Sequence, residues 1–240
     1  MIVPTMTHAE VYRELDKDRE NVGRWWSQKR KVLANIAKWT TKLPRIAWYE
    51  YTSVRNNRYL IYNAIFGHDY NNDSLTGIMA LRKESKGYSV YISWLPWHSR
   101  IGPQVILPHV FDRYADPERG NVRKKGIELI KHFMERNNHG NLSQGDRFSG
   151  RSVRYGGRDN VAKSVNDGVL LGEFVEDIFV AHTFITYEMA TGFQRKEFES
   201  NRENIISNAE FVEMVKKENE EEYRQMREEV IEEIMRSVRY

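Results

Sequence analysis

The residues best suited to chemistry lie in the segment SWLPWHSRIGPQVILPHVFDRY, which runs from Ser93 to Tyr114. Pro108 fits the first turn of a helix, where its missing N–H group is not needed. A helix that begins there places His109 and Arg113 on one face, because side chains at positions i and i+4 are neighbours. A titratable imidazole beside a permanent cation can carry out acid–base chemistry on a phosphate group.

A second group of cations follows in the stretch from Gly145 to Lys163. Its glycines favour a loop over a helix, and the stretch lacks the apolar stripe that a packed helix needs. Guanidinium groups bind phosphate oxygens in pairs, so an arginine-rich loop is a candidate phosphate-binding element. Its arginines are three or four residues apart: Arg147, Arg151, Arg154 and Arg158.

These groups together match the needs of a metal-independent ribonuclease. That reaction requires a base for the 2′-hydroxyl group, an acid for the leaving 5′-oxygen and cations for the phosphate. His109 would be the base or the acid. The candidate phosphate ligands are Arg113, Arg151 and Arg154. Either of two tyrosines would donate a proton or stack on a base: Tyr187 or Tyr155.

A structural interpretation of the same residues stays open. His109 would then pack or cap the helix, and Arg113 would pair with a nearby acid, Asp112 or Asp116. The arginine-rich loop would serve only solubility. The mutual geometry of the side chains decides between the two interpretations.

The stretch from Pro108 to Tyr187 resembles the small RelE-like and BrnT-like endoribonuclease toxins. The resemblance rests on His109 and Arg113 at a helix start, on a second helix, and on a late strand that ends at Ile185-Thr186-Tyr187. It implies a compact antiparallel sheet against helices and metal-independent cleavage of RNA. The chain is far longer than those toxins. It also has a strand meander before the histidine, and the toxins lack this meander.

Composition excludes several classes of function. The 240-residue chain has no cysteine, which rules out disulfides and thiol chemistry. We see no signal peptide and no apolar run near the ~20 residues of a membrane span, so we expect a soluble cytoplasmic protein that contacts no membrane. The motifs of nucleotide-binding loops, serine hydrolases and zinc proteases are absent, and we therefore predict no cofactor.

We predict no metal site either. The segment from Asp69 to Asp73 begins like a calcium loop, but Ser74 stands where that loop needs glycine and Ala80 where it needs glutamate. His132 and His139 are not joined by a cysteine or an acidic cluster. The first segment is therefore read as a polar turn, and the two histidines as surface or capping groups.

The net charge of +3 hides two regions of opposite sign. From Arg119 to Lys163 there are eleven Lys or Arg and four acidic residues. From Glu197 to the C-terminus there are thirteen Glu and seven Lys or Arg. We expect the first region to attract RNA or single-stranded DNA, and the second to form a homo-oligomer or to contact the first.

The first element is a helix from His8 to about Thr41. Thr7 and Glu10 form a capping box at its start, and an amphipathic stripe predicts that one face packs on a core. The opposite face is basic. It can contact nucleic acid, but a solvated face is the commoner meaning of such a pattern. Its cations are Arg24, Lys29, Arg30, Lys31 and Lys38.

Aromatic and β-branched runs with short turns predict an antiparallel meander after this helix. Its strands are Arg45–Thr52, Arg58–Phe66, Thr76–Arg82 and Gly87–Trp94. Later elements are a second helix after the Pro108 helix, a hairpin, and a terminal helix that opens with a capping box at Ser200 and Glu203. Their predicted ranges are Asn121–Asn137 for the second helix, and Gly168–Phe174 and Asp177–Tyr187 for the hairpin.

This order predicts an α+β fold in which an antiparallel sheet packs against an N-terminal helix and C-terminal helices. We expect one domain over residues 1–195 and a helical extension over residues 196–240. The favoured function is nucleic-acid binding, with metal-independent RNA cleavage as the candidate activity. The alternative is a non-catalytic assembly or structural protein of a phage or other mobile element.

Overall fold

The long first helix, α1 (His8–Trp39), starts as the sequence predicts. In this computed structural model the Glu10 amide donates to Thr7 Oγ1 (3.2 Å), and the Thr7 amide donates to Glu10 Oε2 (2.8 Å). The structure describes residues 1–92, 102–137, 140–144, 161–190 and 192–202, together with Met214 and Lys217. None of the described helices is both long and apolar enough to cross a membrane.

All strands of the described residues belong to one sheet of nine, which is mostly antiparallel. Its order is β1-β2-β3-β4-β5-β9-β8-β7-β6. The first four strands form the predicted meander: β1 (Arg45–Thr52), β2 (Arg58–Ile65), β3 (Ser74–Glu84) and β4 (Gly87–Ile92). The others are β5 (Gln104–Ile106), β6 (Asn141–Gln144), β7 (Val161–Val165), β8 (Gly168–Val175) and β9 (Ile178–Ile185).

One contact in the sheet departs from the predicted antiparallel arrangement. Strand β5 pairs antiparallel with β4 but parallel with β9. It has three residues, all buried, and their sequence carries no alternation that would mark a strand. This short strand joins the meander to the later hairpin, so that the two form one continuous sheet.

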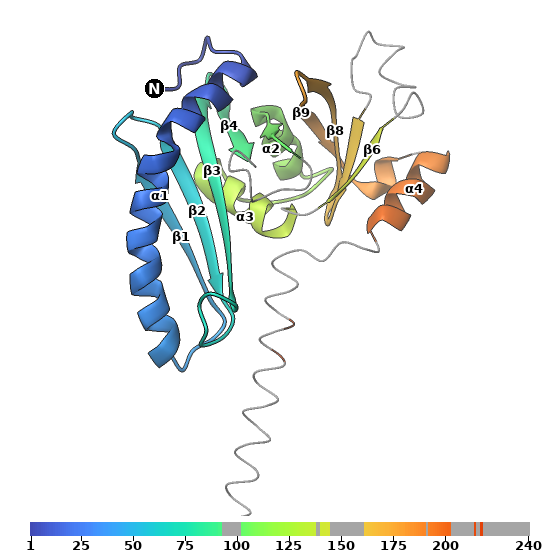
Figure 1. Ribbon diagram of the computed structural model, residues 1–240. Helices are drawn as coiled ribbons and strands as arrows, with labels where there is room; N and C mark the ends of the chain where they lie inside the picture. Colours follow the sequence, from blue (N-terminus) through green and yellow to red (C-terminus); the bar gives the residue numbers. More distant parts are fainter. Residues whose placement is uncertain are drawn as a thin grey trace, which may run out of the picture.

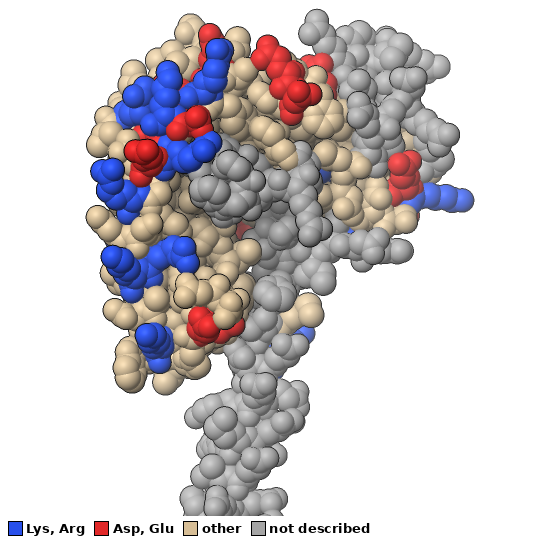
Figure 2. All heavy atoms as spheres, in the orientation of Figure 1, with Lys and Arg blue, Asp and Glu red and all other residues tan. Residues whose placement is uncertain are grey.

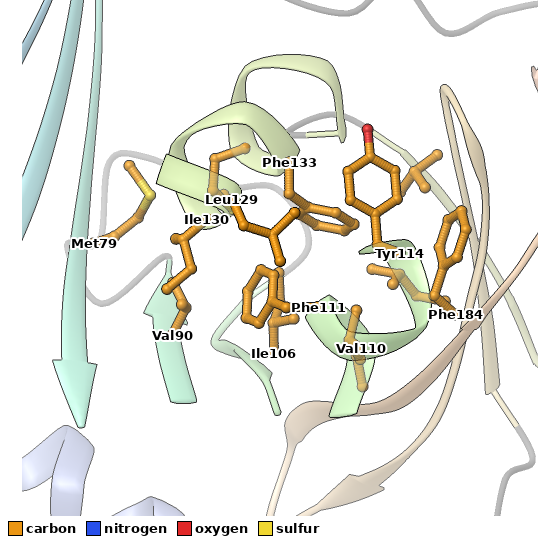
Figure 3. Packing of buried hydrophobic residues seen from close by; sticks show 14 of the residues in the cluster. Met79, Val90, Ile106, Val110, Phe111, Tyr114, Leu129, Ile130, Phe133 and Phe184 are labelled. Atoms are coloured by element: carbon orange, nitrogen blue, oxygen red, sulfur yellow. The ribbon is translucent and has the colours of Figure 1, made fainter. Parts of the chain in front are cut away.

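Helices cover both faces of the sheet (Figure 1). Helix α1 lies against one face and buries Val11, Leu15, Val22, Trp26 and Leu33 in a cluster with alternate residues of the central strands. Helices α2 (Pro108–Ala115) and α3 (Gly126–Asn137) lie against the other face. There Phe111, Tyr114 and Phe133 pack edge to face, as Figure 3 shows.

Helix α3 begins later than the sequence predicts. The expected start at Asn121 is wrong, because the helix begins at Gly126. Gly126 has a φ of 56°, a left-handed conformation that glycine adopts easily and that a continuous helix cannot contain. Val122, which the predicted range Asn121–Asn137 places inside this helix, instead precedes it and packs at the margin of the core.

The terminal region also differs from expectation at its start. Ser200 does not cap a helix, because α4 (Gly192–Arg202) already contains it. Phe198 of α4 is buried with Tyr187 and Ala190. Tyr187 begins the short helix η2 (Tyr187–Met189), which follows β9, and Ala190 comes directly after that helix. The predicted boundary between residues 195 and 196 falls inside α4. Most of the acidic segment lies outside the described residues, so its proposed role in assembly stays a prediction.

Candidate functional site

The structure brings His109 and Arg113 together on α2. Pro108 occupies the first turn of this helix, as predicted. Arg113 Nε donates a hydrogen bond to His109 Nε2 (3.1 Å), and the histidine is exposed. Since Nε2 accepts this bond, the imidazole is neutral and carries its proton on Nδ1.

The surroundings of His109 favour the neutral ring. Partial burial lowers its pKa, and the Arg113 guanidinium lowers it further, while Asp112 acts in the opposite direction. Arg113 Nη1 also lies 3.6 Å from Asp116 Oδ2, which is the acid pairing of the structural interpretation. In this arrangement the acceptor nitrogen of His109 is occupied by Arg113.

A half-buried carboxylate, Asp167, fixes α2 and α3 to the turn between β7 and β8. Asp167 Oδ2 accepts from Tyr114 Oη of α2 (2.6 Å), and both of its oxygens accept from the Arg136 guanidinium of α3. Asn137 of α3 both donates to this carboxylate and accepts from the Asp167 amide. Burial opposes ionisation, but the hydrogen bonds from Arg136 and Tyr114 outweigh it and lower the pKa of Asp167.

The other predicted site residues do not join this pair in the described structure. Tyr187 is buried in the cluster of η2 and α4, where its hydroxyl donates to the Val165 carbonyl and its ring lies 5.0 Å from the Arg202 guanidinium. Burial raises its pKa well above the usual tyrosine range. Arg151 and Arg154 fall outside the described residues. A catalytic role for these residues therefore stays a prediction.

A concentration of positive charge, separate from His109 and Arg113, lies on α1 and the edge strand β1. Residues 21–49 contain seven Lys or Arg and no acidic residue. Figure 2 shows Lys and Arg side chains along the side of the molecule that α1 and β1 form. Within the described structure, no ion pair joins any of these seven to a carboxylate. They are Arg24, Lys29, Arg30, Lys31, Lys38, Lys42 and Arg45, and we name the surface that they form the α1–β1 face.

Aromatic rings lie among these cations. Trp25 of α1 stacks on Tyr51 of β1 with ring centroids 4.7 Å apart and an angle of 22° between the planes. Lys29 Nζ lies 5.6 Å from the Trp25 ring, and Trp39, at the end of α1, is 85% exposed. The sequence shows the charges, but it does not show that Trp25 and Tyr51 meet across two elements. This contact between α1 and β1 could therefore not be predicted from the sequence alone.

A buried amine lies on the face of the sheet that α2 and α3 cover, opposite α1. Lys163 of β7 is 2% exposed, and its Nζ donates to Gln104 Oε1 of β5 (2.8 Å). Burial alone lowers its pKa to about 8. The amide oxygen is neutral, so it satisfies one donor of the ammonium group without balancing its charge.

No group of three or more His, Cys, Asp or Glu side chains gathers at a metal-binding distance in the part of the chain that the structure describes. Comparison of the chain with protein-family models, with curated proteins and with solved structures finds no match.

Proposed function

We propose that this protein binds single-stranded nucleic acid, RNA or DNA, on the α1–β1 face. One observation carries the proposal: seven cations without a single acid follow one another along α1 and into β1. Cations that have no carboxylate partner attract a phosphate backbone, and the release of its counterions drives binding. A carboxylate among them would weaken the attraction, and residues 21–49 contain none.

The aromatic rings favour single strands over duplexes. A single strand can place its bases on exposed rings, whereas the bases of a duplex are already stacked on one another. Trp39 is the most exposed ring of the face, and Trp25 of α1 stacks on Tyr51 of the edge strand β1. The face thus combines a charged track with stacking positions.

The basic region that the sequence favours, Arg119 to Lys163, is less well supported in its described part. Arg119 donates to the Phe184 carbonyl, Arg136 is paired with Asp167, and the Lys163 amine is buried. These cations are engaged inside the protein and have little capacity left for phosphate. The exposed cations that remain in the described part are Arg123, Lys124 and Lys125.

Two triple variants separate these surfaces, because each removes three positive charges. Affinity for a labelled single-stranded oligonucleotide is measured by fluorescence anisotropy over a range of salt concentrations. The first triple combines Arg24→Ala, Lys31→Ala and Lys38→Ala, and we expect it to lower the affinity. It should also reduce the slope of log K against log salt by about 2, because each lost phosphate contact contributes roughly 0.7. The matched triple replaces Arg123, Lys124 and Lys125 with alanine.

The matched triple is expected to keep the wild-type slope to within about 0.7, one phosphate contact. If it loses affinity while the α1 triple binds normally, the nucleic acid lies on the other basic region. If the wild-type protein binds no oligonucleotide at low salt, the proposed function is wrong.

Trp39→Ala tests the stacking part of the proposal. We expect this change to weaken binding of single strands by roughly 5- to 150-fold, because a base stacked on an aromatic ring is worth about 1 to 3 kcal/mol. Binding of duplex DNA of equal length should change by less than about 2-fold, since duplex bases cannot reach the ring. Phe174→Ala is the control, because Phe174 is an exposed ring, 38% accessible, in β8 outside this face. Equal losses for single strands and duplexes would contradict a stacking role.

A further inference from the structure

A β-bulge in the sheet sets His182 apart from its neighbours. Along β8 and β9, Leu171 pairs with Thr183 while Gly172 pairs with Ala181, so that His182 is the extra residue on β9. The backbones approach closely here: a Cβ on Gly172 would collide with the Val180 carbonyl. Bulges bend a strand and redirect one side chain, and they are frequent beside active sites.

The redirected imidazole faces a carboxylate on the α1 side of the sheet. Glu173 is the direct partner of Val180, and Val180 belongs to the core beneath α1, so both side chains lie on that side. His182 Nε2 lies 3.3 Å from Glu173 Oε1, yet it makes no hydrogen bond within the described structure. The two side chains are 34% and 19% exposed.

A second imidazole, His8, lies on the same side of the sheet at the first turn of α1. Its Nδ1 lies 3.0 Å from the hydroxyl of Tyr91, a buried residue of β4. The Arg82 guanidinium sits 5.4 Å from the Tyr91 ring, and it donates to the Met6 carbonyl just before α1 (2.8 Å). His8 is therefore held by α1, β3 and β4 together.

The charges around His8 favour its neutral form. Burial lowers its pKa most, Arg82 lowers it further, Glu84 acts in the opposite direction, and His182 also lowers it. Tyr91 pairs with Val105, and Val105 pairs with Val180, the direct partner of Glu173. The tyrosine that His8 contacts and the carboxylate that His182 faces therefore lie in one row across neighbouring strands. His8 thus contacts a tyrosine hydroxyl and His182 faces a carboxylate. Two imidazoles on one face of a sheet are suited to the roles of general base and general acid.

We propose that His8 and His182 form an acid–base pair that cleaves single-stranded RNA. His8 takes the proton from a ribose 2′-hydroxyl, and the 2′-oxygen forms a bond to the adjacent phosphorus. The bond from phosphorus to the 5′-oxygen breaks, and protonated His182 gives its proton to that oxygen. The products are a 2′,3′-cyclic phosphate and a 5′-hydroxyl, and no oxidant, reductant or further reactant is needed. This inference takes its substrate from the proposed function.

The test uses the full chain, a labelled single-stranded RNA and EDTA, with product ends identified by mass spectrometry. We expect 2′,3′-cyclic phosphate ends, and we expect DNA of the same sequence to stay intact because it has no 2′-hydroxyl. His8→Asn and His182→Gln should each slow cleavage by roughly 10² to 10⁴-fold, the usual size of an acid–base contribution. His8→Asn keeps a polar atom near Tyr91, which protects the fold.

The control is His132→Ala, an imidazole on α3, which packs on the other face of the sheet. This variant should cleave at the wild-type rate. Binding is followed separately with 2′-O-methyl RNA, which cannot be cleaved, and both site variants should bind it normally. Equal circular dichroism spectra and melting temperatures confirm that the variants are folded.

Several outcomes overturn the inference. RNA that is bound but left intact would refute cleavage while the proposed binding function stands, whereas no binding of either RNA would refute the binding function itself. Cleavage that persists in His8→Asn and His182→Gln but is lost in His109→Ala would place the chemistry at α2. Cleavage that is lost in EDTA but restored by a divalent cation would show a metal-dependent reaction, contrary to the mechanism proposed.

Discussion

Replacing Asp18 with alanine is expected to lower the free energy of unfolding by about 3 to 5 kcal/mol, because three buried donors lose their acceptor. Asp18 is fully buried on α1. Its Oδ2 accepts hydrogen bonds from Asn57 Nδ2 (2.9 Å), Tyr59 Oη (2.8 Å) and Ser53 Oγ. Unfolding in urea, followed by circular dichroism, measures the change.

Asp16→Ala is the matched control for Asp18. Asp16 is an exposed carboxylate two residues before Asp18 on α1, and it is paired with Arg19. Removal of an exposed ion pair on a helix costs less than about 1 kcal/mol. The argument fails if the two variants unfold at the same urea concentration.

Loss of Asp18 should also affect nucleic-acid binding, because of what the residue holds in place. Ser53 and Asn57 belong to the turn between β1 and β2, where the Ser53 amide donates to the Asn57 carbonyl. Asp18 therefore fixes α1 to the edge hairpin of the sheet. The α1–β1 face consists of residues from both elements, so a looser contact between them should weaken binding of single strands before the protein unfolds.

Local signals explain how well the first half of the chain could be predicted. Thr7 and Glu10 contact one another within a single helical turn, and the strands of the meander are joined by short turns. The contact of His109 with Arg113 is equally local, because it spans one turn of α2. Each of these features depends on residues that are near in sequence, and the sequence therefore contains the information needed.

The remaining features depend on contacts between distant segments. The bulge at His182 exists only because β8 and β9 pair in a particular register, and His8 meets Tyr91 only when α1 lies across the meander. The burial of Tyr187 likewise requires α4 and β7 to pack around η2. Periodicity and capping motifs carry no information on such pairings, so the sequence offered His109 as the prominent histidine and gave no reason to select the other two.

The amine of Lys163 gives the second large expected effect, a stability that rises with pH. Its pKa is about 8 in the folded protein against an ordinary value of 10.5. Below pH 8 both the folded and the unfolded chain hold the proton, and the folded protein bears the full cost of the buried charge. Between these two values the folded protein releases the proton while the unfolded chain retains it, so stability increases with pH. Above 10.5 no further gain is expected.

This titration should be measured as the difference in unfolding free energy between the wild-type protein and Lys163→Met. A pKa difference of this size corresponds to about 3 kcal/mol, since one unit is worth 1.36 kcal/mol. The wild-type protein should therefore gain about 3 kcal/mol relative to the variant between pH 7 and 10.5. Groups that titrate equally in both proteins cancel in the difference. The cost of leaving Gln104 Oε1 without its donor adds a constant offset that does not change with pH. A difference for Lys163→Met that does not change with pH would show that its amine is not buried as a cation.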